Sequence, residues 1–306
     1  MSTTTASLRR KIQSAGDLQS VVRTMKALAA ASIGQYQQAV RALGDYYRTV
    51  ELGLAACLRE NRPVALPAKP ERRPKAEVIS AVVFGSDQGL VGQFNEGVAD
   101  FAIQTLAALP GTARVSAVGE RVQARLADAG LPLVGLFTVP TSVQAITPLV
   151  GQILVDAEAG LRRSQGAELH LFYNRPTSGA VYAPAHQRLL PLDDAWWRRL
   201  AQTPWPTGKL PEVLAGGTAT LRALIREYLF VGLFRACAES LASEQASRLA
   251  AMERADRNIN ELLEHLSGAF HRLRQSGIDE ELFDVIAGFE ALSGPARGPG
   301  ARSLQP

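Results

Sequence analysis

The chain has 306 residues, enough for two domains or for one domain with an extended element, and its 46% hydrophobic content is ordinary for a soluble protein. The formal net charge is only +4, and Lys and Arg do not gather with aromatic residues as in nucleic-acid binders, so no nucleic-acid partner is expected. Two cysteines, Cys57 and Cys237, are too few for a disulfide scaffold and indicate a reducing compartment.

Residues 1–62 are predicted to form one long helix. Apolar residues recur at alternating spacings of three and four from Leu8 to Cys57, and no proline precedes Pro63. This heptad spacing places one side of a helix against a partner helix. Residues 63–77 contain several prolines among Lys and Arg, and are predicted to be a solvated linker.

Residues 78–205 are predicted to form an α/β domain. Alternation of apolar strands with helical segments is typical of a parallel sheet with crossover helices. The strands are expected at 78–84, 114–118, 133–139 and 169–173, and the helices at 94–109, 121–129 and 143–161. The segment 181–190 is expected at a sheet edge because it contains Pro184. Residues 191–217 are expected to be irregular, with Trp196 and Trp197 covering one face of this domain.

Residues 206–292 are predicted to form the partner helix. Its seam has the same spacing, at Leu249, Met252, Asp256, Ile259, Leu263, Leu266, Phe270 and Leu273. The charged seam residues Lys26 and Asp256 are expected to be neighbours in an antiparallel pair, because polar seam positions often fix register. That alignment sets Leu8 beside Arg274 and leaves the helix uncovered from about Ile278. Residues 293–306 are predicted to be a disordered tail.

An apolar stripe is expected in the uncovered part of this helix. Leu282, Phe283, Ile286 and Phe289 share one side of it, and no N-terminal helix remains to cover them. We expect this end of the helix to seat against another protein. The fold class predicted for the chain is therefore α/β, with a long antiparallel coiled coil of the terminal helices and a central Rossmann-like domain with a mostly parallel sheet.

The motifs of common catalytic chemistry are missing from the sequence. The glycine-rich turn at residues 85–92 matches neither G-x-G-x-x-G nor G-x-x-x-x-G-K-[ST], and no Lys follows it to meet a phosphate. The four histidines lack metal-ligand spacing, and no serine lies in a G-x-S-x-G turn. No apolar run reaches the ~18 residues of a membrane span, and the first residues lack a signal-peptide core. We expect no catalytic residue, cofactor or metal in this chain.

Three sequence blocks resemble the gamma subunit of the F-type rotary ATP synthase. The first is residues 8–14 with 21–30, LRRKIQS and VVRTMKALAA, similar to the family's I-T-K-A-M-x-M-V-A-A segment. The second is residues 86–95, SDQGLVGQFN, close to the family's S-D-R-G-L-C-G-G-L-N. The third and most specific is residues 242–252, ASEQASRLAAM, with a continuation to Leu292. Together the blocks span nearly the whole chain.

The chain departs from the family pattern at several positions. Gln88 stands in place of the family's arginine, Val91 of its cysteine and Gln93 of a glycine. Ser32 stands where the N-terminal segment usually ends in lysine, and the chain continues past Leu292. These departures indicate a divergent member of the family, from the main or from an alternative copy of the complex.

The resemblance implies a non-catalytic rotor shaft. The terminal helices would turn inside a ring of alpha and beta subunits, and the α/β domain would lie against the epsilon subunit and the c-ring, peripheral to the cytoplasmic face of the inner membrane. Ion flow, of protons or of sodium ions, would drive rotation and ATP synthesis at the beta subunits. The matched positions imply a set of candidate contacts to beta: Arg23, Met25, Lys26, Gln245, Arg248, Arg274 and Gln275. A role confined to stabilising the coil is an equal alternative for each.

Two other functions fit parts of the sequence. An α/β metabolite-binding enzyme with helical oligomerisation arms would hold its ligand at the carboxyl ends of the strands, near Asp87 or Asn95. A static coiled-coil tether would need no rotation at all. Tight binding of a metabolite would favour the first, and full activity after a fixed cross-link would favour the second.

Overall fold

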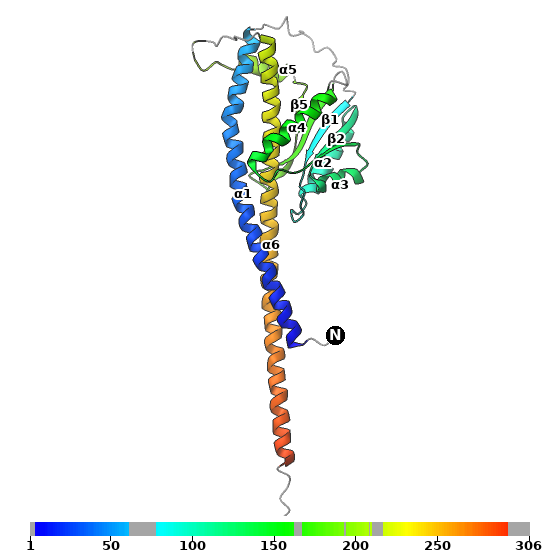
Figure 1. Cartoon of the computed structure of the whole chain (residues 1–306), viewed down its shortest axis with the longest axis vertical. Helices are drawn as coiled ribbons and strands as arrows, with labels where there is room; N and C mark the ends of the chain where they lie inside the picture. Colours follow the sequence, from blue (N-terminus) through cyan, green and yellow to red (C-terminus); the bar gives the residue numbers. More distant parts are fainter. Residues whose placement is uncertain are drawn as a thin grey trace, which may run out of the picture. The chain divides into compact units, whose positions relative to one another are not determined.

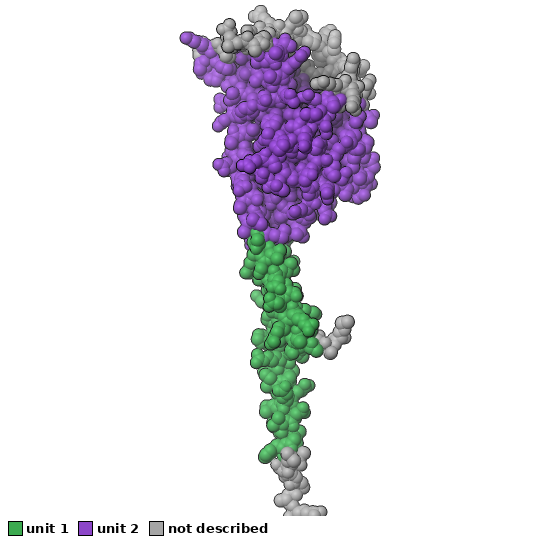
Figure 2. All heavy atoms as spheres, in the orientation of Figure 1, with its two compact units in different colours: residues 1–24, 254–306 green, residues 25–253 purple. Residues whose placement is uncertain are grey.

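The computed structural model describes residues 4–60, 78–161, 167–192, 194–207, 209 and 217–292. Both the expected linker at 63–77 and the expected tail at 293–306 lie outside these residues. The chain divides into two compact units, residues 1–24 with 254–306, and residues 25–253 (Figure 2). Helix α1 (Thr5–Glu60) and helix α6 (Gly217–Leu292) each contribute residues to both units (Figure 1).

In the first unit, α1 and α6 pair in antiparallel fashion. Leu8, Ala15 and Val22 of α1 are buried, and so is Ile259 of α6. The guanidinium of Arg9 lies over the ring of Phe270, 5.6 Å from its centroid. Arg9 contacts Phe270 and the later Gln19 contacts the earlier Asn260, so the two helices run in opposite directions, as the resemblance implied.

The register of this pair is within one helical turn of the predicted one. The alignment of Leu8 with Arg274 would place Arg9 opposite residue 273, and the structure places it against Phe270. Asp256 is paired with Arg23, three residues before Lys26, with 3.4 Å between Nε and Oδ1. An α-helix turns once in about 3.6 residues, so the shift is less than one turn.

The second unit contains the α/β domain. Its five-stranded sheet has the order β3-β2-β1-β4-β5, in which only the β4–β5 pair is antiparallel. The strands are β1 (Val78–Phe84), β2 (Thr112–Val118), β3 (Leu133–Phe137), β4 (Glu168–Arg175) and β5 (Ala183–Leu190). The connecting helices are α2 (Phe94–Ala108), α3 (Glu120–Asp128) and α4 (Val143–Leu161), the last of which continues through Pro148. β5 lies at the sheet edge, where its Pro184 predicted it.

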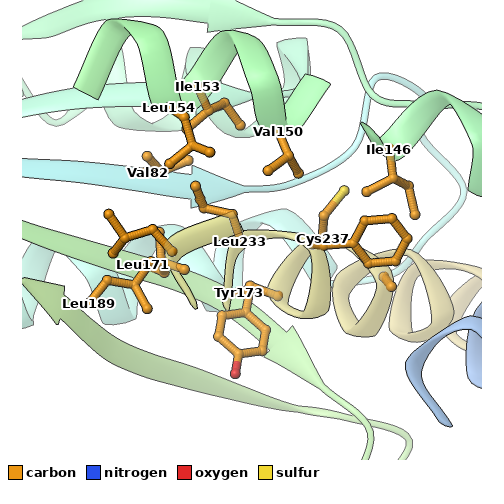
Figure 3. Close-up of a cluster of buried hydrophobic side chains, with 14 of the residues drawn as sticks. Val82, Ile146, Val150, Ile153, Leu154, Leu171, Tyr173, Leu189, Leu233 and Cys237 are labelled. Atoms are coloured by element: carbon orange, nitrogen blue, oxygen red, sulfur yellow. The ribbon is translucent and has the colours of Figure 1, made fainter. Parts of the chain in front are cut away.

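Two hydrophobic clusters hold the layers of this unit together. On one face of the sheet, Val98 and Ala102 of α2 and Val122 and Leu126 of α3 are completely buried. On the other face, α4, α6 and α1 share one core with the sheet. Figure 3 shows residues of this second core drawn from β1, α4, β4, β5 and α6: Val82, Ile146, Val150, Ile153, Leu154, Leu171, Tyr173, Leu189, Leu233 and Cys237. The long helices are therefore part of the domain's core.

Residues 191–217 differ from the irregular segment that we expected. They include helix α5 (Asp194–Gln202), whose Trp196 and Leu200 are buried one turn apart. Trp196 packs edge-on against Tyr228 of α6, with ring centroids 4.9 Å apart. This buried apolar face holds the short helix against the domain. Trp196 therefore covers the domain as expected, but it does so from a helix and not from an irregular segment.

Gly119 generates a stability prediction. Its φ is +111°, and an added Cβ would lie 2.8 Å from the backbone of Ser86. Gly119→Ala should lower the free energy of unfolding by about 3 kcal/mol or more, because neither backbone segment can move aside without breaking the loop. Gly130 is the matched control, because its φ of +74° is also positive but no atom lies within 4 Å of an added Cβ. Gly130→Ala should cost only about 1 kcal/mol. Urea denaturation measures both losses, and equal losses would contradict this account.

Candidate functional site

The far end of α6 has no partner helix among the described residues. Past Leu273 its apolar side chains are exposed, by 56% at Leu282 and by 71% at Phe289. They lie with Phe283 and Ile286 on the stripe predicted from the sequence, and Ile278 and Val285 add to the exposed apolar surface. Monomeric soluble proteins rarely expose a contiguous patch of this kind unless another molecule covers it.

Polar side chains interrupt the apolar seam around Asp256 in the first unit. Its Oδ1 accepts hydrogen bonds from Nε2 of Gln19 and Nε of Arg23, and Gln19 also donates to Asn260. The Arg23 side chain is 61% exposed, whereas that of Asp256 is 17% exposed. An ion pair this open to water contributes at most about 1 kcal/mol, so the cluster mainly fixes which turn of α1 faces which turn of α6.

In the second unit, α6 carries a buried ion pair. Glu244 and Arg248 are one turn apart, 2.7 Å separates Oε1 from Nη2, and both side chains are at least nine-tenths buried. Oε2 of Glu244 and Nε of Arg248 have no hydrogen-bond partner among the described residues. Burial raises the pKa of the Glu244 carboxyl, and the neighbouring Arg248 opposes that rise. Such a pair costs free energy to bury, which suggests a role other than stability.

The glycine-rich turn after β1 lies beside this pair and is held by its own polar side chains. Oδ1 of Asp87 accepts the backbone N–H of Glu120 at 3.0 Å, and its Oδ2 accepts that of Val139 at 2.9 Å. The Asn95 side chain is buried and hydrogen-bonds both the backbone N–H and the hydroxyl of Ser86. Asp87 and Asn95, near which the metabolite-binding alternative would place a ligand, therefore connect the loops at this edge of the sheet.

A cavity of about 180 Å³ lies between part of this turn and the long helices, and the carbonyl of Val91 in the turn accepts a hydrogen bond from the Ser247 hydroxyl of α6. Its walls come from the turns after β1 and β3, from α1 and from α6, all in the second unit. The side chains that line it include Ser32, Tyr36, Asp87, Gln88, Glu244 and Arg248. Open α/β sheets usually bind ligands at the carboxyl ends of their strands, and here that place is occupied by the protein's own helices.

The histidine pair is a contact that sequence spacing did not reveal. Nδ1 of His170 lies 2.7 Å from Nε2 of His186, and its Nε2 lies 2.7 Å from a carboxylate oxygen of Glu168. Burial lowers the pKa of His170, and Glu168 opposes that shift. The contact depends on the β4–β5 register, in which His186 faces Phe172 across the strands. In the described residues, no group of three or more His, Cys, Asp or Glu is arranged to hold a metal ion.

The described helices also contain no stretch long and apolar enough to cross a membrane. The exposed apolar end of α6 suits a contact with another protein.

Comparison with known proteins distinguishes the rotary-subunit function from the metabolite-binding alternative. The family model for ATP synthase matches residues 4–292. An ATP synthase gamma chain of Salinibacter ruber is 31% identical over 303 residues, which cover 93% of this chain and 97% of that relative. The chain belongs to the ATP synthase gamma chain family. A gamma chain of Moorella thermoacetica is 28% identical over 290 residues, with 93% of this chain and 98% of the relative covered.

Solved structures support the same fold for this gamma chain. A chain in the Euglena gracilis mitochondrial ATP synthase (OSCP, F1 and c-ring) has a TM-score of 0.63 at 16% identity, with 98% of this chain and 99% of that one covered. A chain in the Tetrahymena thermophila mitochondrial ATP synthase, central stalk and c-ring, has a TM-score of 0.53 at 19% identity, with coverage of 77% and 99%. The metabolite-binding enzyme proposed as an alternative is not favoured.

The candidate residues of this gamma chain fall at different places. Arg274 and Gln275 are exposed on α6, and Met25 and Lys26 are half-buried on α1. Gln245 and Arg248 line the same cavity, and Arg23 pairs with Asp256. Sequence reasoning missed Glu244 as a site residue, although it stands four residues before Arg248, the spacing that brings opposite charges together on a helix.

The seam contacts of the first unit generate a cross-linking prediction. Cysteines introduced at Gln19 and Asn260 should form a disulfide on oxidation, because these two side chains are hydrogen-bonded across the pair. Gln19→Cys combined with Ser267→Cys is the control, because residue 267 lies about two turns or ~10 Å farther along α6. Non-reducing electrophoresis after limited proteolysis distinguishes the two. Efficient linkage of the control pair would show that the register is wrong.

Proposed function

We propose that this gamma chain is a rotor shaft that transmits rotation between the c-ring of Fo and the alpha and beta subunits of F1, without catalysing a reaction itself. The observation that carries the proposal is the exposed apolar end of α6. An earlier part of the same helix contributes to the core of the α/β domain. A shaft must seat its tip in a surrounding bearing and receive torque at its other end. Contact through an apolar stripe suits sliding because it does not depend on fixed ion pairs.

The hydrogen bonds of the polar residues at the strand ends suit a mechanical role. Asp87 and Asn95 are engaged in loop hydrogen bonds, and the turn at 85–92 has no lysine to meet a phosphate. ATP would then be made or hydrolysed at the beta subunits, which respond to the side of the shaft that faces them. The α/β domain would lie with the epsilon subunit and the c-ring at the cytoplasmic face of the inner membrane, held there by the complex.

The candidate contacts to the beta subunits differ in what their environment allows. Arg274 and Gln275 are exposed, as contact with another subunit requires, and Arg23 is more than half exposed despite its ion pair. Arg248 is buried against Glu244, so we assign it to positioning α6 beside the 85–92 turn. Met25, Lys26 and Gln245 are half-buried and can serve both the coil and a partner.

The isolated gamma chain should not bind ATP. No described loop forms a phosphate cradle, and no described acidic cluster could hold the accompanying magnesium ion. Calorimetric titration with Mg-ATP should give no measurable heat of binding up to millimolar nucleotide, while the assembled complex serves as the positive control. Micromolar binding by the gamma chain alone would contradict a mechanical role.

The tip should matter for coupling through its apolar surface. Replacing Phe283 and Ile286 together by Asp should lower ATP-driven ion pumping by at least about tenfold, since each large apolar side chain is worth ~1.5–3 kcal/mol when buried. Asp284→Asn and Glu280→Gln are matched controls on the same turns and should leave pumping near its original rate. Likewise, truncation after Leu292 should be nearly silent, whereas truncation before Ile278 should impair assembly or coupling. A harmless double Asp variant would exclude an apolar bearing.

A further inference from the structure

Two adjoining hollows form a groove between α1 and α6 in the second unit. Their volumes are about 390 and 230 Å³, and both are lined by Val40, Arg41 and Arg235. The larger hollow is also lined by Arg175, the last residue of β4, and by Glu239 of α6. We call this surface the arginine groove, because its lining combines three arginines with apolar side chains of both helices.

Positive charge exceeds negative charge in the arginine groove. The carboxylate of Glu239 is the acidic group in its lining, against three guanidinium groups. The Glu239 side chain is only 8% exposed, whereas those of Arg175 and Arg235 are 47% and 53% exposed. The basic groups therefore face water more than the acidic group does, and the groove presents a surplus of cations to whatever enters it.

Glu239 holds two of the arginines by one nitrogen each. Its Oε1 accepts a hydrogen bond from Nε of Arg235 at 2.8 Å, and its Oε2 accepts one from Nε of Arg175 at 3.1 Å. Nη2 of Arg175 also donates to the hydroxyl of Tyr173 at 2.6 Å. A guanidinium group has five N–H donors, so both arginines keep donors for a further acceptor. The buried carboxylate thus fixes two cations in place without using up their capacity to bind an anion.

Arg41 is the third cation of the groove. It is exposed, and its side chain forms no ion pair or hydrogen bond among the described residues. Asp45 follows it by one turn on α1 but does not pair with it. Because Arg41 and Arg235 line both hollows, an anion bound there would interact favourably with both of them.

We propose that the arginine groove is a docking site for an acidic segment of a neighbouring protein in the complex. An Asp or Glu side chain of that segment binds Arg41 and Arg235, since planar guanidinium groups match a carboxylate. An adjacent apolar side chain of the segment packs against Val40, and this apolar lining favours a peptide over a free inorganic anion. The inference goes beyond the rotor role, because it needs an assembled neighbour but no rotation.

The first experiment identifies the occupant in the assembled complex. A photoreactive benzoylphenylalanine at position 37, where Gln37 lines the larger hollow, should cross-link to a peptide of another subunit. Mass spectrometry should place an Asp or Glu within a few residues of the linkage. The matched control carries the probe at position 38, because Gln38 is equally exposed but lines neither hollow, and it should not link to that peptide.

Several results of this experiment would overturn the inference. They are no linkage from position 37, linkage to a peptide without an acidic residue, linkage to a lipid, and linkage within the gamma chain itself. Each of these would leave the rotor role intact, because that role is tested separately at the tip of α6.

The second experiment reverses the charge on each side of the contact. Arg41→Glu should speed dissociation of the linked subunit from the purified complex by about tenfold, because it replaces an attraction by a repulsion. The gamma chain itself should stay folded, since Arg41 has no partner within it to lose. Changing the partner's acidic residue to Lys in the same complex should restore slow dissociation.

Arg222→Glu is the matched control for the change in charge. Arg222 is exposed on α6, lines neither hollow and lies ~20 Å along the helix from Arg235, so its reversal should leave dissociation unchanged. Equal effects of the two Glu variants would overturn the inference, and so would an Arg41→Glu effect that the partner's Lys fails to reverse.

Discussion

The apolar seam between α1 and α6 is the constraint on which the structure depends. Helices of 56 and 76 residues would be unstable alone because each would expose a long apolar stripe to water, and where they pair each covers the stripe of the other. In the second unit the same helices also complete the core of the sheet, with Leu54 of α1 and Leu233 of α6 completely buried. The α/β domain therefore has a finished core on this face only when both helices are in place.

The packing of α1 and α6 against the sheet also explains how the loops at the carboxyl ends of the strands are used. A Rossmann-like sheet normally leaves the carboxyl ends of its strands open to a ligand. Here α1 and α6 run past those ends, and Asp87 and Asn95 connect the turns to one another. The polar groups of the glycine-rich turn thus connect the neighbouring loops, and its Val91 carbonyl accepts a hydrogen bond from Ser247 of α6. The buried pair of Glu244 and Arg248 is the polar element at this junction.

Much of the fold could be predicted from the sequence, because it follows local periodicity. The strand and helix segments of the α/β domain were placed to within a few residues, and Pro184 located the edge strand. Helix α5 was missed because its apolar face is short and becomes meaningful only against Tyr228. The cavity and the pair of His170 and His186 were missed because each joins segments whose proximity depends on tertiary packing or strand register. Sequence motifs identified candidate residues, but only the tertiary structure showed which of these residues contact one another.

The two edges of the sheet affect whether this chain aggregates before it is incorporated into a complex. β3 is only five residues long, and β5 carries Pro184, which has no N–H to offer, together with the charged Arg188. Short strands, proline and charge all discourage a further strand from adding to an edge. Before assembly, a newly made chain exposes the apolar end of α6. Its sheet edges nevertheless disfavour the strand-to-strand pairing that leads to many aggregates.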